Sequence, residues 1–174
     1  MTKTLLSIGH GYCARAVTPL LLSAGWTVIG TTRSTESAAA LAASGVTPVI
    51  WPGTDLTPYL QAASHILIST APTVAGDPLL DAYDLTPHTF DWVGYLSTTG
   101  VYGDHNGAWV DEETPLAPTT KRGQYRVLAE TQWKDQHQPA HIFRLAGIYG
   151  PGRGPFTKVR EGTARRIIKP GQVF

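Results

Sequence analysis

The residues best suited to chemistry lie near the start of the chain, in the glycine-rich segment 9–14, which reads GHGYCA. This segment matches the pattern G-x-G-x-x-A and directly follows a short apolar run, residues 4–8. A glycine turn between a strand and a helix holds the diphosphate of a dinucleotide on the first main-chain N–H groups of that helix. We expect Gly9 to form the turn, Gly11 to leave room for the phosphate and Ala14 to let the helix pack on the strand. The residues assigned to this site are Gly9, Gly11, Tyr12 and Ala14.

Two other side chains in this segment are interpreted as having no part in chemistry. We expect His10 to face solvent on the turn, and Cys13 to be a small filler in the helix. Because Cys13 is the only cysteine, the sequence predicts neither an internal disulfide nor a cysteine metal site, as is typical of a reducing compartment. No apolar run approaches the roughly 20 residues that cross a bilayer. These features predict a cytoplasmic protein without a metal.

A second polar group follows the next apolar run, at Thr32-Arg33-Ser34. In dinucleotide-binding folds an acid at the end of the second strand accepts the ribose hydroxyls of NAD and repels the 2′-phosphate of NADP. This chain has no acid there, and Arg33 can bind a phosphate through charge-assisted, forked hydrogen bonds. We therefore expect NADP, with NAD as the alternative, and assign all three residues to the cofactor site. An ordinary solvated arginine is the alternative interpretation of Arg33.

The elements that must position these residues follow from the alternation of apolar runs and helical patterns. Strands are expected at 4–8, 26–29, 46–51, 65–69, 92–97 and 141–145, and helices at 12–24, 37–43 and 121–134. Residues 73–90 leave room only for a short helix, because Pro78 and Pro87 interrupt them. Strands that are apolar almost throughout favour an α/β fold, with a parallel sheet covered on both faces. Right-handed crossovers then give a Rossmann-type, doubly wound sheet with flanking helices.

Three further blocks carry a family resemblance. They are residues 96–103, LSTTGVYG, residues 111–115, DEETP, and residues 144–153, RLAGIYGPGR. Together with the glycine turn they resemble the extended or atypical short-chain dehydrogenase/reductase superfamily, in its NAD-dependent epimerase/dehydratase-like branch. The resemblance covers essentially the whole chain. It implies a dinucleotide-binding Rossmann domain at 1–150 and the start of a substrate-binding segment at 151–174, with the rest of a C-terminal substrate lobe missing or truncated.

The resemblance also implies roles for residues at the strand ends. Thr98 matches the position at which the family orients a substrate hydroxyl or carbonyl, and the alternative is that its hydroxyl only caps the strand end. Other residues are implied to line the ribose and nicotinamide of the cofactor. These are Thr70, Ala71, Pro72, Leu145 and Gly147.

The helix expected at 121–134 departs from the family pattern. Family members with redox chemistry carry Tyr-x-x-x-Lys there, and the aligned positions hold Arg122 and Arg126. An arginine keeps its proton in proteins, so Arg122 cannot act as an ordinary acid or base, although Arg126 can still bond the cofactor ribose. Tyr125 lies three residues after Arg122, on nearly the same helix face, between two cations. Tyr125 is therefore the candidate replacement acid, and a packing tyrosine is the alternative.

Charge and length bear on the expected partners. The net charge of +1 gives no general attraction to nucleic acid or membranes, and we expect neither as a partner. The basic residues from Arg153 to Lys169 match, by resemblance, a region that faces anionic, often nucleotide-sugar, substrates, and solvated charges are the alternative. We therefore expect a small-molecule substrate of anionic character and leave a homodimer open. A fragment, a truncated gene product and a minimal form all fit the length.

Two functions follow from these observations. The leading one is an NADP-linked oxidoreductase or epimerase/dehydratase-like enzyme that moves a hydride between the nicotinamide and a bound alcohol or carbonyl, with Thr98 orienting the oxygen. The alternative is a dinucleotide-binding protein without hydride chemistry, acting as a sensor or an assembly partner. Retention of Thr98 favours the first, and the replacement of Tyr-x-x-x-Lys by Arg122 and Arg126 favours the second.

Overall fold

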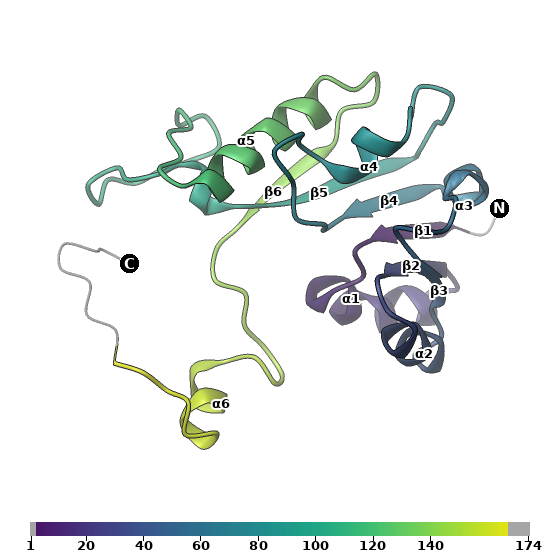
Figure 1. The fold of residues 1–174 in the computed structure, drawn as a ribbon, viewed down its shortest axis with the longest axis horizontal. Coiled ribbons are helices and arrows are strands. Elements are labelled where there is room, and N and C mark those ends of the chain that lie inside the picture. Colours follow the sequence, from purple (N-terminus) through teal and green to yellow (C-terminus); the bar gives the residue numbers. More distant parts are fainter. Residues whose placement is uncertain (1–2, 167–174) are drawn as a thin grey trace.

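The computed structural model describes residues 3–166, and Figure 1 shows their arrangement. The part of the expected substrate segment beyond residue 166, including Lys169 of the basic stretch, lies outside the described residues. The elements are β1 (Thr4–Ile8), α1 (Tyr12–Ser23), β2 (Thr27–Thr32), α2 (Thr35–Ala43), β3 (Thr47–Ile50), α3 (Thr57–Ala62), β4 (His65–Ile68), α4 (Pro78–Ala82), β5 (Trp92–Thr98), the 3₁₀ turn η1 (Thr99–Val101), α5 (Lys121–Lys134), β6 (His141–Leu145) and α6 (Pro155–Arg160).

The six strands form one parallel sheet in the order β3-β2-β1-β4-β5-β6. The chain starts at β1, builds outward to β3, crosses back to β4 and then builds outward in the opposite direction. This confirms the predicted α/β, Rossmann-type doubly wound fold. The switch in direction lies between β1 and β4, and in open parallel sheets ligands bind outside the carboxyl ends of the strands at such a point. The glycine turn after β1 lies there.

Alternating side chains of the strands build a separate core on each face of the sheet. Leu6 and Ile8 of β1 join the larger cluster, which α3, α4 and α5 cover, and Leu5 joins the smaller one beneath α1 and α2. Figure 1 shows α4 and α5 on one side of the sheet and α1 and α2 on the other. Trp133 of α5, buried to 1% exposure, fills the larger core against Tyr95 of β5. This contact packs α5 against β5.

One expectation about coverage is wrong. The sheet is not covered on both faces throughout, because on the α1 side an apolar groove of about 380 Å³ remains over β4, β5 and β6. Trp92, Leu96 and Phe143 line this groove, and Phe143 keeps 42% of its surface exposed. The cause is topological: the helices that follow β1 and β2 reach only their own half of this face. Figure 1 shows α6 away from the sheet.

Element boundaries agree with the expectations where caps mark them. The helix α5 begins after Thr120, whose hydroxyl accepts the N–H of Gly123 over 3.1 Å, and it spans the expected residues. The helix α1 ends before Gly25, which has a φ of +77°. The strand β2 runs three residues beyond the expected end, to Thr32, because it is paired with β1 and β3 on both sides. The short helices α3 and α6 were not expected.

Among the described residues, no helix combines the length and the apolar character that crossing a membrane requires.

Candidate functional site

The glycine turn is built by contacts that only glycine permits at its first position. Gly9 has a φ of +76°, and a Cβ atom there would lie 3.0 Å from Cγ2 of Thr70 and 3.1 Å from its nitrogen. The N–H of Gly9 donates to Oγ1 of Thr31 over 2.7 Å, and Ser69 Oγ donates to O of Gly9. The ends of β1, β2 and β4 therefore meet at Gly9. Gly9 forms the predicted turn, and its part in binding a cofactor stays a prediction.

The second glycine leaves space above the start of the helix. Gly11 is exposed, and a Cβ atom there would meet only O of Gly9, at 3.7 Å. Gly11 caps α1 without a side chain, and the first turn holds no acidic residue. The N–H of Gly11 donates to O of Gly9 over 2.7 Å. The N–H groups of Tyr12 to Ala14 come first in the helix and therefore have no acceptor within it. An anion placed over Gly11 would face these amides and the positive end of the helix.

The helix packs closely on the strand below this turn. Ala14 is buried to 1% exposure and belongs to the smaller core, as its place in the motif predicted. A larger side chain would push the helix away from β1.

The prediction that His10 faces solvent is wrong. His10 is 4% exposed, and a Cβ atom on Gly30 would lie 2.8 Å from its ring. Its Nε2 lies 3.1 Å from Oγ1 of Thr18, whose hydroxyl donates to O of Ala14 over 2.8 Å. Because that hydroxyl hydrogen is used, His10 donates through Nε2–H. Burial, and secondarily the charge of Arg15, lowers the pKa of His10 from 6.5 to about 4.

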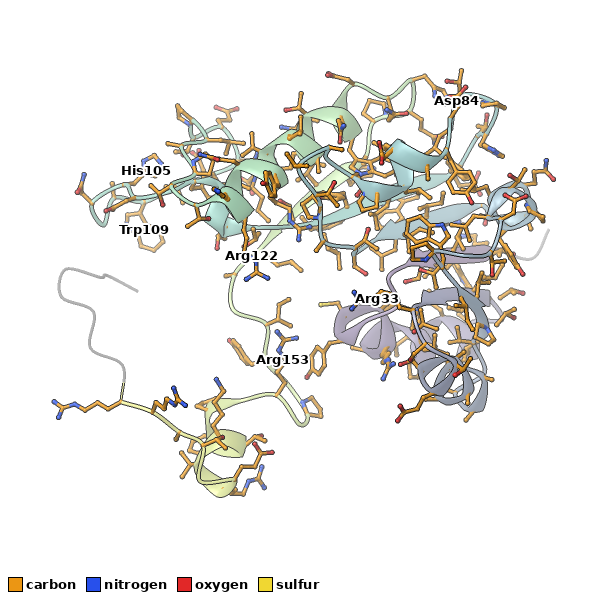
Figure 2. The ribbon with its side chains drawn as sticks, viewed as in Figure 1. Arg33, Asp84, His105, Trp109, Arg122 and Arg153 are labelled. Atoms are coloured by element: carbon orange, nitrogen blue, oxygen red, sulfur yellow. The ribbon has the colours of Figure 1, made fainter. Side chains whose placement is uncertain are left out.

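The residues expected to select NADP follow β2 directly. Arg33 is exposed, and Figure 2 shows its side chain at the carboxyl edge of the sheet, on the side of α1. Thr32 is half-buried. Ser34 caps α2, because its Oγ accepts the N–H of Ser37 over 3.2 Å, and its own hydroxyl donates to Ser37 Oγ. Of the three, Arg33 alone presents a free charge to a ligand beside the glycine turn.

The residues expected around the nicotinamide lie at the ends of β4 and β6. Thr70 is half-buried against Gly9, and its Oγ1 is buried with no hydrogen-bond partner among the described residues. Ala71 is exposed and Pro72 half-buried in the loop after β4. Leu145 ends β6 and lines the apolar groove, and Gly147 has open space around it. The loop after β4 and the end of β6 therefore lie on opposite sides of β5.

The expected catalytic residues lie at the end of β5 and on α5. Thr98 ends β5, half-buried, and its Oγ1 accepts the N–H of Gly100 over 3.2 Å, so the capping alternative describes a contact that it makes. Tyr125 is half-buried on α5. Arg122 is exposed near the start of α5, and Figure 2 shows it pointing toward the segment that follows β6.

Arg126 is held by the protein itself. Its Nη1 donates to O of Leu96 over 2.9 Å, to the hydroxyl of Tyr95 over 3.1 Å and to O of Thr70 over 3.4 Å. The guanidinium also lies over the Tyr95 ring, 5.5 Å from its centroid. Burial is the main reason why the pKa of Tyr95 rises to about 12, so this phenol stays protonated. Arg126 thus ties the carboxyl ends of β4 and β5 together.

Sequence reasoning missed a buried charged cluster behind the strand ends. Glu130 of α5 is 1% exposed and pairs with Arg144 of β6 over 3.0 Å, and Ser97 donates to the same carboxylate. Arg144 also donates to the hydroxyl of Tyr102 over 3.0 Å and to O of Glu112 over 3.1 Å. The signal was a lone charge within an otherwise apolar strand. The cluster links β5, β6 and α5 to one another.

The comparisons with known proteins agree with this geometry. A solved protein of unknown function from Silicibacter pomeroyi is 56% identical and matches with a TM-score of 0.90 over 99% of this chain and 62% of that one. A protein assigned as an NAD-dependent epimerase/dehydratase from Methylobacillus flagellatus is 25% identical, with a TM-score of 0.63 over 92% of this chain and 59% of that one. The chain has the fold of the extended short-chain dehydrogenase/reductases. The UDP-N-acetylglucosamine 4-epimerase of Bacillus cereus shares this short-chain dehydrogenase/reductase fold at 17% identity, with a TM-score of 0.56 over 81% of this chain and 52% of that one.

Among curated proteins, YeeZ of Escherichia coli K12 is 28% identical over 88% of this chain and 61% of YeeZ. No protein-family model matches the chain. The chain therefore spans about three fifths of the length of YeeZ and of the Silicibacter pomeroyi protein.

Proposed function

We propose that this chain binds NADP(H) on the glycine turn after β1 and moves a hydride between the nicotinamide and the carbon of a bound alcohol or carbonyl. The observation that carries the proposal is the open N-terminus of α1. Gly11 is exposed with free space above it, no acidic side chain occupies the first turn, and the turn lies where the sheet changes direction. Solved relatives with this fold include proteins named as epimerases and reductases.

The residues present fit a dinucleotide. A side chain at position 9 would collide with Thr70, and one at position 11 would fill the space above the helix amides. The buried, unpaired Oγ1 of Thr70 offers a hydroxyl to the ribose beside the turn. Arg33 would bind the 2′-phosphate of NADP through forked hydrogen bonds. The segment 32–34 contains no acidic side chain that would repel this phosphate. NAD is the weaker alternative.

The bound cofactor supplies or accepts the hydride. In the reducing direction a hydride joins the carbonyl carbon and a proton joins its oxygen, which gives the alcohol. Thr98 orients that oxygen with its hydroxyl, and Tyr125 gives up its phenolic proton, which solvent then restores. Arg122 lies three residues before Tyr125 on α5, on nearly the same helix face. Oxidation is the same sequence in reverse.

A second function is favoured by one specific observation. Arg126 donates hydrogen bonds to two main-chain oxygens and to the Tyr95 hydroxyl, at the ends of β4 and β5. A residue used in this way holds the sheet edge together, and Arg122 keeps its proton and cannot replace a tyrosine acid. The alternative is therefore a protein that binds the dinucleotide without hydride chemistry, as a sensor or an assembly partner.

An activity assay on Thr98 variants separates the two. NADPH consumption is measured with a panel of aldehydes and sugar nucleotides, beside dinucleotide binding by calorimetry. Hydride chemistry predicts turnover that Thr98→Val lowers about 100-fold in kcat and Thr98→Ser largely keeps, because the hydroxyl is retained. Thr119→Val, in the exposed loop before α5, is the matched control and should leave kcat unchanged. Tight binding without turnover on any substrate would support the second function, and the absence of binding would reject both.

A further inference from the structure

A short turn after β6 lies against the first residue of α1. Main-chain hydrogen bonds of 2.8 and 2.9 Å run in both directions between Gly150 and Arg153 and close this turn. The hydroxyl of Tyr12 donates to O of Pro151 over 3.1 Å. A Cβ atom on Gly150 would lie 2.5 Å from that hydroxyl oxygen, so a side chain at position 150 would displace the Tyr12 hydroxyl. The turn 150–153 is therefore fitted to the N-terminus of α1.

The turn brings a positive charge to this place. The guanidinium carbon of Arg153 lies 5.3 Å from the centroid of the Tyr12 ring, which is within the range of a cation–π contact. Figure 2 shows Arg153 on the segment between β6 and α6, on the side that faces α1. Tyr12 directly follows Gly11 in the glycine turn. One aromatic side chain thus joins the proposed phosphate site to a cation more than a hundred residues later in the chain.

This charge is unfavourable without an anion. The N-terminus of a helix carries a partial positive charge, and a cation beside it is repelled. The first turn of α1 contains no acidic residue, and Arg15 adds a further exposed cation one turn along. In the described part of the chain Arg153 makes no salt bridge. An anion over Gly11 would relieve the repulsion and use the guanidinium.

We propose that Arg153 binds the diphosphate of the dinucleotide and that Tyr12 positions Arg153, so that the turn 150–153 forms a strap across the glycine turn. This inference rests on the proposed function and adds a second arm to the same site. The diphosphate is common to NAD and NADP, whereas the 2′-phosphate assigned to Arg33 belongs to NADP alone. The two arginines therefore contribute differently: Arg153 to the affinity for both dinucleotides, and Arg33 to the preference between them.

The test is a calorimetric titration of the full chain with NADPH, NADH and ADP. Arg153→Gln should raise the Kd for all three by about tenfold and leave the NADPH to NADH ratio unchanged, because a charge-assisted bond to the shared diphosphate is lost. Arg153→Lys keeps the charge and should lose only about threefold, since the forked geometry is gone. Lys134→Gln removes one exposed positive charge from the end of α5 and is the control, with the wild-type Kd expected.

A second variant tests the positioning role of Tyr12. Tyr12→Phe keeps the ring and removes the bond to Pro151, and we expect a Kd about threefold higher. Combined with Arg153→Gln it should add nothing further, because Tyr12 acts through the guanidinium. A Kd of Arg153→Gln within twofold of wild type, a loss confined to NADPH, or fully additive effects would each overturn the strap while leaving the proposed function intact. A wild-type chain that binds none of the three ligands overturns both.

Discussion

Arg144 of β6 pairs with Glu130 of α5 over 3.0 Å, in a site where the glutamate is 1% and the arginine 11% exposed. Ser97 donates to the same carboxylate, and Tyr102 accepts from the same guanidinium. The pair therefore connects a helix, two strand ends and the turn that follows Thr98. A buried pair does little for stability relative to apolar residues of similar volume, but breaking it leaves an uncompensated charge in the interior.

Removing one member of this pair should be costly. We expect Glu130→Ala to lower the free energy of unfolding by about 3–5 kcal/mol, because the Arg144 guanidinium loses its counter-charge. Urea denaturation measures this, with Glu113→Ala, an exposed acid, as the control. Changing both members to methionine should cost less than the sum of the single changes. Additive costs would show that the two groups are not coupled.

The buried histidine should make stability depend on pH. His10 has a folded pKa of about 4 against 6.5 for a free side chain, so between these values the unfolded chain binds a proton that the folded chain does not. Its contribution is therefore fully present above pH 6.5 and is lost as the pH falls toward 4, up to about 3 kcal/mol. His10→Gln should flatten this part of the stability curve, whereas His141→Gln, at an exposed position, should not. The same dependence of stability on pH in both variants would show that His10 is not its source.

Cofactor preference should follow the charge at position 33. Arg33→Asp replaces a cation that would bind the 2′-phosphate by an acid that repels it and accepts ribose hydroxyls. We expect the preference to change from NADPH to NADH, with the NADPH affinity reduced at least about tenfold. The ratio of the two dissociation constants measures the change. Arg15→Asp makes the same change of charge and is the control, because it should leave the ratio of the NADPH and NADH dissociation constants unchanged. An unaltered ratio in Arg33→Asp would refute the assignment to the 2′-phosphate.

The first glycine should matter for folding as well as for binding. Gly9→Ala places a Cβ atom 3.0 Å from Thr70 at a φ of +76°, so we expect a loss of about 1–3 kcal/mol in the free energy of unfolding. Gly53→Ala, also at a positive φ but with open space around it, separates the cost of backbone strain from that of the clash. Equal losses would mean that Thr70 adjusts without cost.

Local patterns were enough to predict the fold. Apolar runs predicted all six strands, and α1 and α5 lie within the residues where helices were expected. The short helices α3 and α6 were not predicted, because six residues are too few to show a 3.6-residue period. Coverage of the sheet was overestimated, since each helix reaches only the strands beside it.

The site was predictable only where its chemistry is local. The glycine turn lies within six consecutive residues and its geometry matches the motif. The burial of His10 depends on Gly30, and the hydrogen bonds of Arg126 depend on Thr70 and Leu96, all distant in the chain. Such contacts form only after the strands are aligned, so no local pattern indicates them.

Gly11 offers the most direct test of the central claim, that a dinucleotide binds over the open start of α1. A Cβ atom there meets only one oxygen at 3.7 Å, so Gly11→Val should fold with a melting temperature close to that of wild type while its side chain fills the phosphate space. Calorimetric titration with NADPH should show saturable binding to wild type and at least about a hundredfold weaker binding to the variant. Equal binding by both chains, or no heat of binding to wild type with NADPH or NADH, would contradict the account.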